Sequence, residues 1–125
     1  MYKSIQPQHL YHALGGDGAS FCHLLRVFLH VTPPTVSELL HASVEADLGR
    51  AARLSHLLQG SACLLGCEQL CSLTTRAEGV AALGDWAAVN SLAKLIAGEY
   101  ARVTADVLLC LERTEAELAL RSLSC

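Results

Sequence analysis

The chain has 125 residues, of which 52% are hydrophobic, 17% are charged and 5% are aromatic, and its formal net charge is -3. This length suits a single domain, and the high apolar content excludes a disordered chain. The mild negative charge and the few aromatic residues argue against nucleic-acid binding, which would require a basic surface or stacking platforms.

The sequence contains no membrane or export signal. No apolar run reaches the roughly 18 residues of a membrane-spanning helix, and the first ten residues, MYKSIQPQHL, have no apolar signal segment. We therefore expect a cytoplasmic protein without membrane insertion. An apolar core of this size needs no covalent staples, so free thiols are expected at the six cysteines, Cys22, Cys63, Cys67, Cys71, Cys110 and Cys125.

The apolar spacing is helical along nearly the whole chain. A short helix is expected within QPQHLYHAL, and the glycine-rich GGDG that follows would end it. Another helical face begins at Phe21 and continues to about residue 46. Its TPP sequence leaves two alternatives open: a new helix capped by Thr32, or one helix with a proline kink. Beyond the prolines, the inner face is expected to hold Val36, Leu39, Leu40 and Val44.

Three further helices follow, each bounded by recognisable start and stop residues. Asp47 is a candidate N-cap for a helix that Gly66 would end, and Gly84 and Asp85 separate the last two helices. The four long segments lie near residues 20–46, 47–65, 68–83 and 86–118.

Short connections between long amphipathic helices favour a bundle. We predict an all-α fold: an antiparallel up-and-down four-helix bundle with a short extra N-terminal helix. Residues 1–19 would form the N-terminal segment with its short helix, residues 20–118 the bundle, and residues 119–125 a frayed C-terminus.

The third of these helices carries the candidate site. Its core face would hold Ser55, Leu58 and Ala62, and His56 lies about 100° around the helix from Ser55, which predicts an exposed imidazole. Gly60, one turn later, removes a side chain that would shield the ring. The side of His56 is shared by Arg53, Gly60 and Cys63, with Gln59 close by.

The charged residues near this histidine in the sequence are all basic. Between residues 48 and 67 there is no acidic residue, and Arg50 and Arg53 are the only charges. The pattern predicts a small electropositive zone that would tolerate an anion on His56. A single histidine on a helix is most often an ordinary surface residue, so the flanking pattern carries the functional interpretation.

That pattern resembles the motif of histidine-containing phosphotransfer (HPt) domains, roughly A-H-x-L-K-G-S-x-x-x-L-G. Here it reads SHLLQGSACLLG, from Ser55 to Gly66, with Leu57, Gln59, Gly60 and Ser61 in the motif. The upstream stretch with its Phe helix, its Thr-Pro and Asp47 is similar as well, as is GDW before the last helix. The resemblance covers about residues 20–112.

The resemblance implies a helical bundle whose exposed histidine takes a phosphoryl group from a receiver-domain aspartate and passes it to another receiver. His56 would be the phosphoacceptor, through Nε2. The receiver, or a hybrid sensor kinase that carries one, would contact the side marked by Arg53, Leu57, Gln59, Gly60, Ser61 and Cys63. Mg²⁺ would be held by the receiver, and this chain would need no cofactor of its own.

One position departs from the family pattern. The usual Lys three residues after the histidine is Gln59, which donates hydrogen bonds but brings no charge. Arg53 could supply part of that charge. This departure keeps a second hypothesis open, in which the chain is a non-phosphorylated HPt-like docking module.

The spacing of Cys63, Cys67 and Cys71 suggests a third alternative, a metal site. These residues form an i, i+4, i+8 series, but structural zinc sites require a second pair of ligands, and none is evident. We therefore expect no metal.

Overall fold

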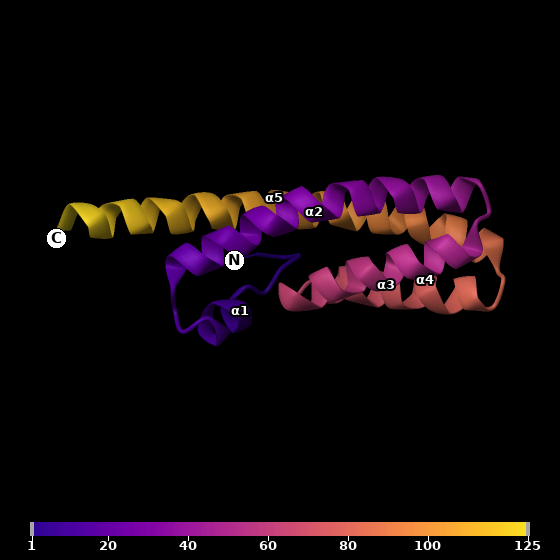
Figure 1. Cartoon of the computed structure of the whole chain (residues 1–125), viewed down its shortest axis with the longest axis horizontal. Coiled ribbons are helices and arrows are strands. Elements are labelled where there is room, and N and C mark those ends of the chain that lie inside the picture. Colours follow the sequence, from indigo (N-terminus) through magenta and orange to yellow (C-terminus); the bar gives the residue numbers. More distant parts are fainter. Residues whose placement is uncertain (1, 125) are drawn as a thin grey trace.

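The computed structural model describes residues 2–124, and helices are the only regular secondary structure in that range, with no β-strand (Figure 1). The helices are α1 (Gln8–Ala13), α2 (Gly18–Val44), α3 (Leu48–Leu64), α4 (Glu68–Ala82) and α5 (Trp86–Ser124). The predicted all-α fold, a four-helix bundle with a short N-terminal helix, is confirmed.

The four long helices form a closed arrangement in chain order. Helix α2 packs on α3, α3 on α4, α4 on α5, and α5 returns to α2, while contacts across the diagonal are sparse. In Figure 1, α3 and α4 lie side by side below α2 and α5. Each helix thus runs antiparallel to its neighbours, which places the turns at the two ends and leaves the helix flanks free for a partner.

Helix α2 passes through its two prolines without a break. Pro33 and Pro34 lie inside the helix, and the axis of α2 changes direction in its middle (Figure 1), as expected where prolines remove backbone hydrogen bonds. Thr32 does not cap a new helix: its buried hydroxyl donates to the Phe28 carbonyl at 2.6 Å and contacts the Tyr100 hydroxyl at 2.7 Å. The kinked-helix alternative is therefore correct.

The turns follow the start and stop residues of the sequence. The Asp47 carboxylate accepts a hydrogen bond from the Arg50 amide at 3.2 Å, and Asp85 accepts one from the Ala88 amide at 3.1 Å. Gly66 and Gly84 take left-handed backbone angles, with φ of 64° and 76°, so each ends a helix where a side chain would be strained.

The C-terminal residues differ from the prediction. Residues 119–124 continue α5 instead of fraying, and residue 125 lies outside the described part of the chain. After Gly98 the sequence has no glycine or proline and is rich in alanine, leucine, arginine and glutamate, which have high intrinsic helix propensity. This end of α5 extends past the rest of the bundle (Figure 1).

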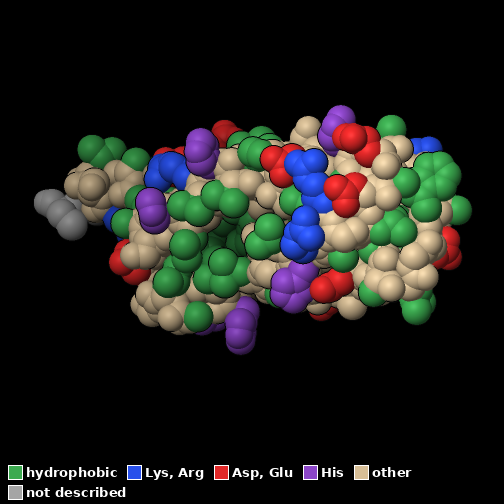
Figure 2. All heavy atoms as spheres, turned by 45° about the vertical axis from the view of Figure 1, so that its right-hand side comes forward, with side chains coloured by type: hydrophobic (Ala, Val, Ile, Leu, Met, Phe, Trp, Pro, Cys, Tyr) green, Lys and Arg blue, Asp and Glu red, His purple; other side chains and the backbone are tan. Residues whose placement is uncertain are grey.

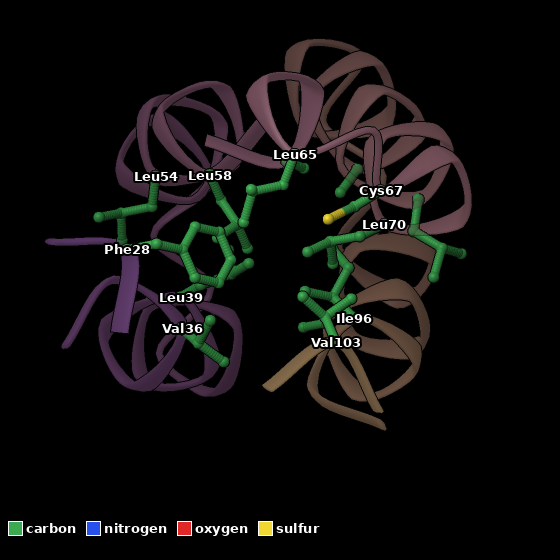
Figure 3. Close-up of a cluster of buried hydrophobic side chains, with 14 of the residues drawn as sticks. Phe28, Val36, Leu39, Leu54, Leu58, Leu65, Cys67, Leu70, Ile96 and Val103 are labelled. Carbon is green, nitrogen blue, oxygen red and sulfur yellow. The ribbon is translucent and has the colours of Figure 1, made fainter. Parts of the chain in front are cut away.

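The core lies between all four long helices. Figure 3 shows side chains from each of them converging, among them Leu39, Leu58, Leu70 and Ile96. Val44 is predicted to face inward but is 72% exposed, because it is the last residue of α2 and lies at the end of the bundle.

Among the described helices, none is both long enough and apolar enough to cross a membrane.

Replacement of Ser55 by alanine is expected to stabilise the bundle. Ser55 is fully buried, and its hydroxyl has no hydrogen-bond partner among residues 2–124. A buried unsatisfied polar group costs about 1–3 kcal/mol, so Ser55→Ala should raise the free energy of unfolding by about 1 kcal/mol in urea titrations followed by circular dichroism.

A matched control is available at Thr74, whose buried hydroxyl donates to the Leu70 carbonyl at 2.9 Å. Thr74→Val removes a satisfied hydroxyl and should give no comparable gain. A loss of stability in Ser55→Ala would show that the hydroxyl has a partner after all.

Candidate functional site

Helix α3 presents His56 to solvent and buries the residues beside it. The His56 side chain is 70% exposed, whereas Ser55, Leu58 and Ala62 are at most 1% exposed. This agrees with the helical-wheel prediction. The buried face fixes the helix in the bundle, so the imidazole projects from a rigid support.

Glu78 of α4 is the closest charged neighbour of the histidine. The His56 Nδ1 atom lies 3.2 Å from the Glu78 carboxylate. A proton on Nδ1 can be donated to this carboxylate, which leaves the lone pair of Nε2 free. Glu78 is not among the residues predicted from the sequence, because it lies on a different helix from the histidine.

His56 belongs to a row of contacts between α3 and α4, which we call the α3–α4 seam. It consists of His56 with Glu78, Gln59 with Thr75, and Cys63 with Cys71. The two members of each pair lie equally far along the chain from Cys67, at the turn. In an antiparallel helical hairpin with a short turn, such residues face each other, and this relation could have revealed Glu78 from the sequence.

The charge near His56 is more balanced than the sequence predicts. Arg50 points to Glu38 of α2, at 3.4 Å, and the Glu78 carboxylate lies beside the imidazole. The expected electropositive zone is therefore wrong in its simple form, because α2 and α4 bring acidic residues to it. On the face drawn in Figure 2, a short band of basic side chains crosses the middle of the molecule with acidic and histidine side chains at its margins, and other basic side chains lie toward both ends.

Arg53 remains on the open side of the histidine. It is exposed and lines a surface hollow of about 460 Å³ together with Ala52, His56, Leu57 and Glu78. Leu57 is 63% exposed at the same place. The hollow therefore offers an imidazole, a guanidinium and an apolar side chain to whatever docks there.

Comparison with known protein families matches residues 23–116 to the Hpt domain. The chain belongs to the Hpt domain family. Hpt domains perform phosphotransfer in two-component phosphorelays and interact there with receiver domains. The matched residues begin in α2 and end in α5, so they include all of α3, which carries the histidine, and all of α4. No curated protein and no solved structure matches the chain.

The remaining predicted site residues of the Hpt domain fall on two sides of α3. Gly60 is exposed, and a Cβ atom added to it would meet no atom within 4 Å. Ser61 is half-buried farther around the helix. Gln59 and Cys63 instead face α4: the Gln59 amide donates to the Thr75 hydroxyl at 2.8 Å. The Gln59 amide is thus already engaged within the Hpt domain.

The three central cysteines of the Hpt domain do not form one stripe. The turn at Gly66 separates the helices, so Cys67 points into the core (Figure 3). Cys63 and Cys71 meet on the seam instead. Burial raises the pKa of the Cys67 thiol to about 12. Within residues 2–124, no three histidine, cysteine or acidic side chains come together in a way that could hold a metal ion.

Proposed function

We propose that this Hpt domain is a phosphorelay intermediate with His56 as its phosphoacceptor. It takes a phosphoryl group from an aspartyl phosphate of a response-regulator receiver or of the receiver in a hybrid sensor kinase, and passes it to the aspartate of another receiver. The single observation that carries the proposal is the exposed imidazole on a helix whose opposite face is buried in the core, with Nδ1 directed at Glu78.

The contact with Glu78 supports Nε2 as the nucleophile. In the transfer, the Nε2 lone pair forms a bond to phosphorus, and the bond between phosphorus and the receiver carboxylate breaks. The ring then carries a positive charge that it shares with Nδ1–H, and the Glu78 carboxylate at 3.2 Å stabilises that charge. Phosphoryl transfer needs mainly position and charge neutralisation, so this chain supplies the oriented nitrogen, and the receiver supplies Mg²⁺.

The open side of α3 at Gly60 supports docking of the receiver beside His56. The hollow at His56 and the bare backbone at Gly60 leave room for an approaching receiver, and Arg53 and Leu57 provide charged and apolar contacts. A cytoplasmic location is part of the same proposal, since the free thiols of the described cysteines fit a reducing compartment.

Gly60→Gln should slow transfer and stabilise the bundle. No internal contact requires this glycine, and glycine in a helix costs about 0.5–1 kcal/mol relative to alanine. We expect the rate of transfer from a receiver to fall by about tenfold, which corresponds to about 1.4 kcal/mol. Gly60→Ala, which adds only a Cβ atom, should gain stability and keep transfer. An unchanged rate in Gly60→Gln would place docking elsewhere.

Gln59→Lys should lengthen the lifetime of the phosphohistidine modestly. The substitution places a cation one turn from His56, and exposed charge pairs contribute about 0–1 kcal/mol, so the change should not exceed about fivefold. Gln59→Met, which also loses the Thr75 contact but has no charge, is the control. Equal lifetimes in the two variants, measured by loss of label over time, would contradict the assignment of charge as the cause.

The test of the function is incubation with phosphorylated receiver domains, followed by detection of acid-labile phosphate on this chain. The second candidate, a docking-only module, is favoured by one observation: Gln59 replaces the usual cation and its amide is engaged by Thr75. Receivers that bind the chain but never phosphorylate it would support that candidate.

A further inference from the structure

Two thiols meet at the end of the α3–α4 seam that is nearest the turn between the two helices. The Sγ atoms of Cys63 in α3 and Cys71 in α4 lie 2.7 Å apart. A disulfide bond is about 2.05 Å long, so a small rotation of the two side chains would join them. The pair lies about 10 Å along the α3 axis from His56 and plays no part in the phosphoryl transfer proposed above.

Exposure distinguishes this pair from the other described cysteines. Cys63 is exposed and Cys71 is half-buried, whereas Cys22, Cys67 and Cys110 are buried. A surface hollow of about 460 Å³ opens beside the pair, with Glu68 and Arg76 also among its lining residues. A small oxidant can therefore reach Cys63 without any opening of the bundle.

We propose that Cys63 and Cys71 form a redox-reactive dithiol that a low-molecular-weight disulfide oxidises reversibly to a disulfide between α3 and α4. The Cys63 thiolate attacks the small disulfide, forms a mixed disulfide and releases one small thiol. Cys71 then attacks the Cys63 sulfur and releases the second. Two electrons pass from the cysteine pair to the small disulfide, and the two thiol protons end on the two released thiols.

The surroundings of the two sulfurs support this order of attack. The hydrogen bond with Cys63, and to a lesser extent burial, raise the pKa of the Cys71 thiol, which makes the exposed Cys63 the first nucleophile. Burial raises the pKa of Cys67 to about 12, so Cys67 stays protonated and does not compete. The product would clamp the two helices on the same seam as His56.

The test is oxidation of the full chain with glutathione disulfide, followed by peptide mapping without reductant. Cleavage after Glu68 separates Cys63 from Cys71, so a new disulfide would hold the two peptides together until a reductant is added. Cys63→Ser and Cys71→Ser should each abolish this linkage, whereas Cys67→Ala should retain it. Circular dichroism of each variant checks that the helices are intact.

Two further readouts complete the test. In Cys71→Ser, the glutathione adduct should persist on Cys63, because the resolving thiol is missing. The oxidised native chain should melt at a temperature about 5 °C or more above the reduced chain. A stable glutathione adduct on native Cys63, a linkage through Cys67 or Cys125, or a lower melting temperature after oxidation would overturn the proposal.

Discussion

Replacement of His56 by alanine is expected to abolish phosphoryl acceptance and leave the bundle folded. The substitution removes the only nucleophilic nitrogen that the helix presents beside the Arg53 hollow. The side chain is 70% exposed, so its loss should change the free energy of unfolding by less than about 0.5 kcal/mol. Transfer of label from a phosphorylated receiver and urea unfolding measure the two effects.

The chain offers a matched control for this substitution at His41. The His41 side chain is 66% exposed on α2 and is paired with Glu45 through Nε2, whereas His56 is paired with Glu78 through Nδ1. His41→Ala should keep full acceptance. Acceptance that survives in His56→Ala, or falls equally in both variants, would assign the phosphoryl group to another residue.

Gly66→Ala is expected to cause a large loss of stability. Gly66 has a φ of 64°, and a Cβ atom there would lie 2.7 Å from the Gln6 carbonyl oxygen and 2.9 Å from its Cβ atom. The left-handed conformation costs a side chain about 1–2 kcal/mol, and the forced shift of the N-terminal segment adds about 1–3 kcal/mol. Urea unfolding should therefore show a loss of about 2–5 kcal/mol, the sum of the two contributions.

Gly84 separates these two contributions. It also ends a helix with a positive φ, of 76°, but a Cβ atom there would meet nothing within 4 Å. Gly84→Ala should lose only the conformational cost of about 1–2 kcal/mol. Equal losses in the two variants would mean that Gln6, whose backbone N–H donates to the Leu65 carbonyl at 3.0 Å, does not pack as closely as the structure shows.

Much of the fold could be predicted because its determinants are local. Asp47 and Asp85 cap helices, and Gly66 and Gly84 end them, through backbone groups within a few residues. The two alternatives at Thr32 could not be separated in this way. Its hydroxyl contacts Tyr100 on α5. A contact between residues far apart in the chain cannot be predicted from the spacing of neighbouring residues.

The site also has features that follow from local sequence and features that depend on packing between helices. Exposure of His56 follows from the periodicity of one helix, which places Ser55 and Leu58 in the core. The contact at the imidazole Nδ1 atom is made by Glu78, and the contact at the Gln59 amide is made by Thr75. Both require the register between α3 and α4, which only the packed hairpin fixes.

The central claim is tested most directly by locating the phosphoryl group after transfer from a receiver. Cleavage after Arg53 and Arg76 releases residues 54–76, in which His56 is the only histidine, while the other histidines lie on different peptides. We predict a phosphoryl group on this peptide that survives mild alkali, is lost in acid and is absent from His56→Ala. Acid-stable phosphate, or phosphate on a peptide without His56, would contradict the account.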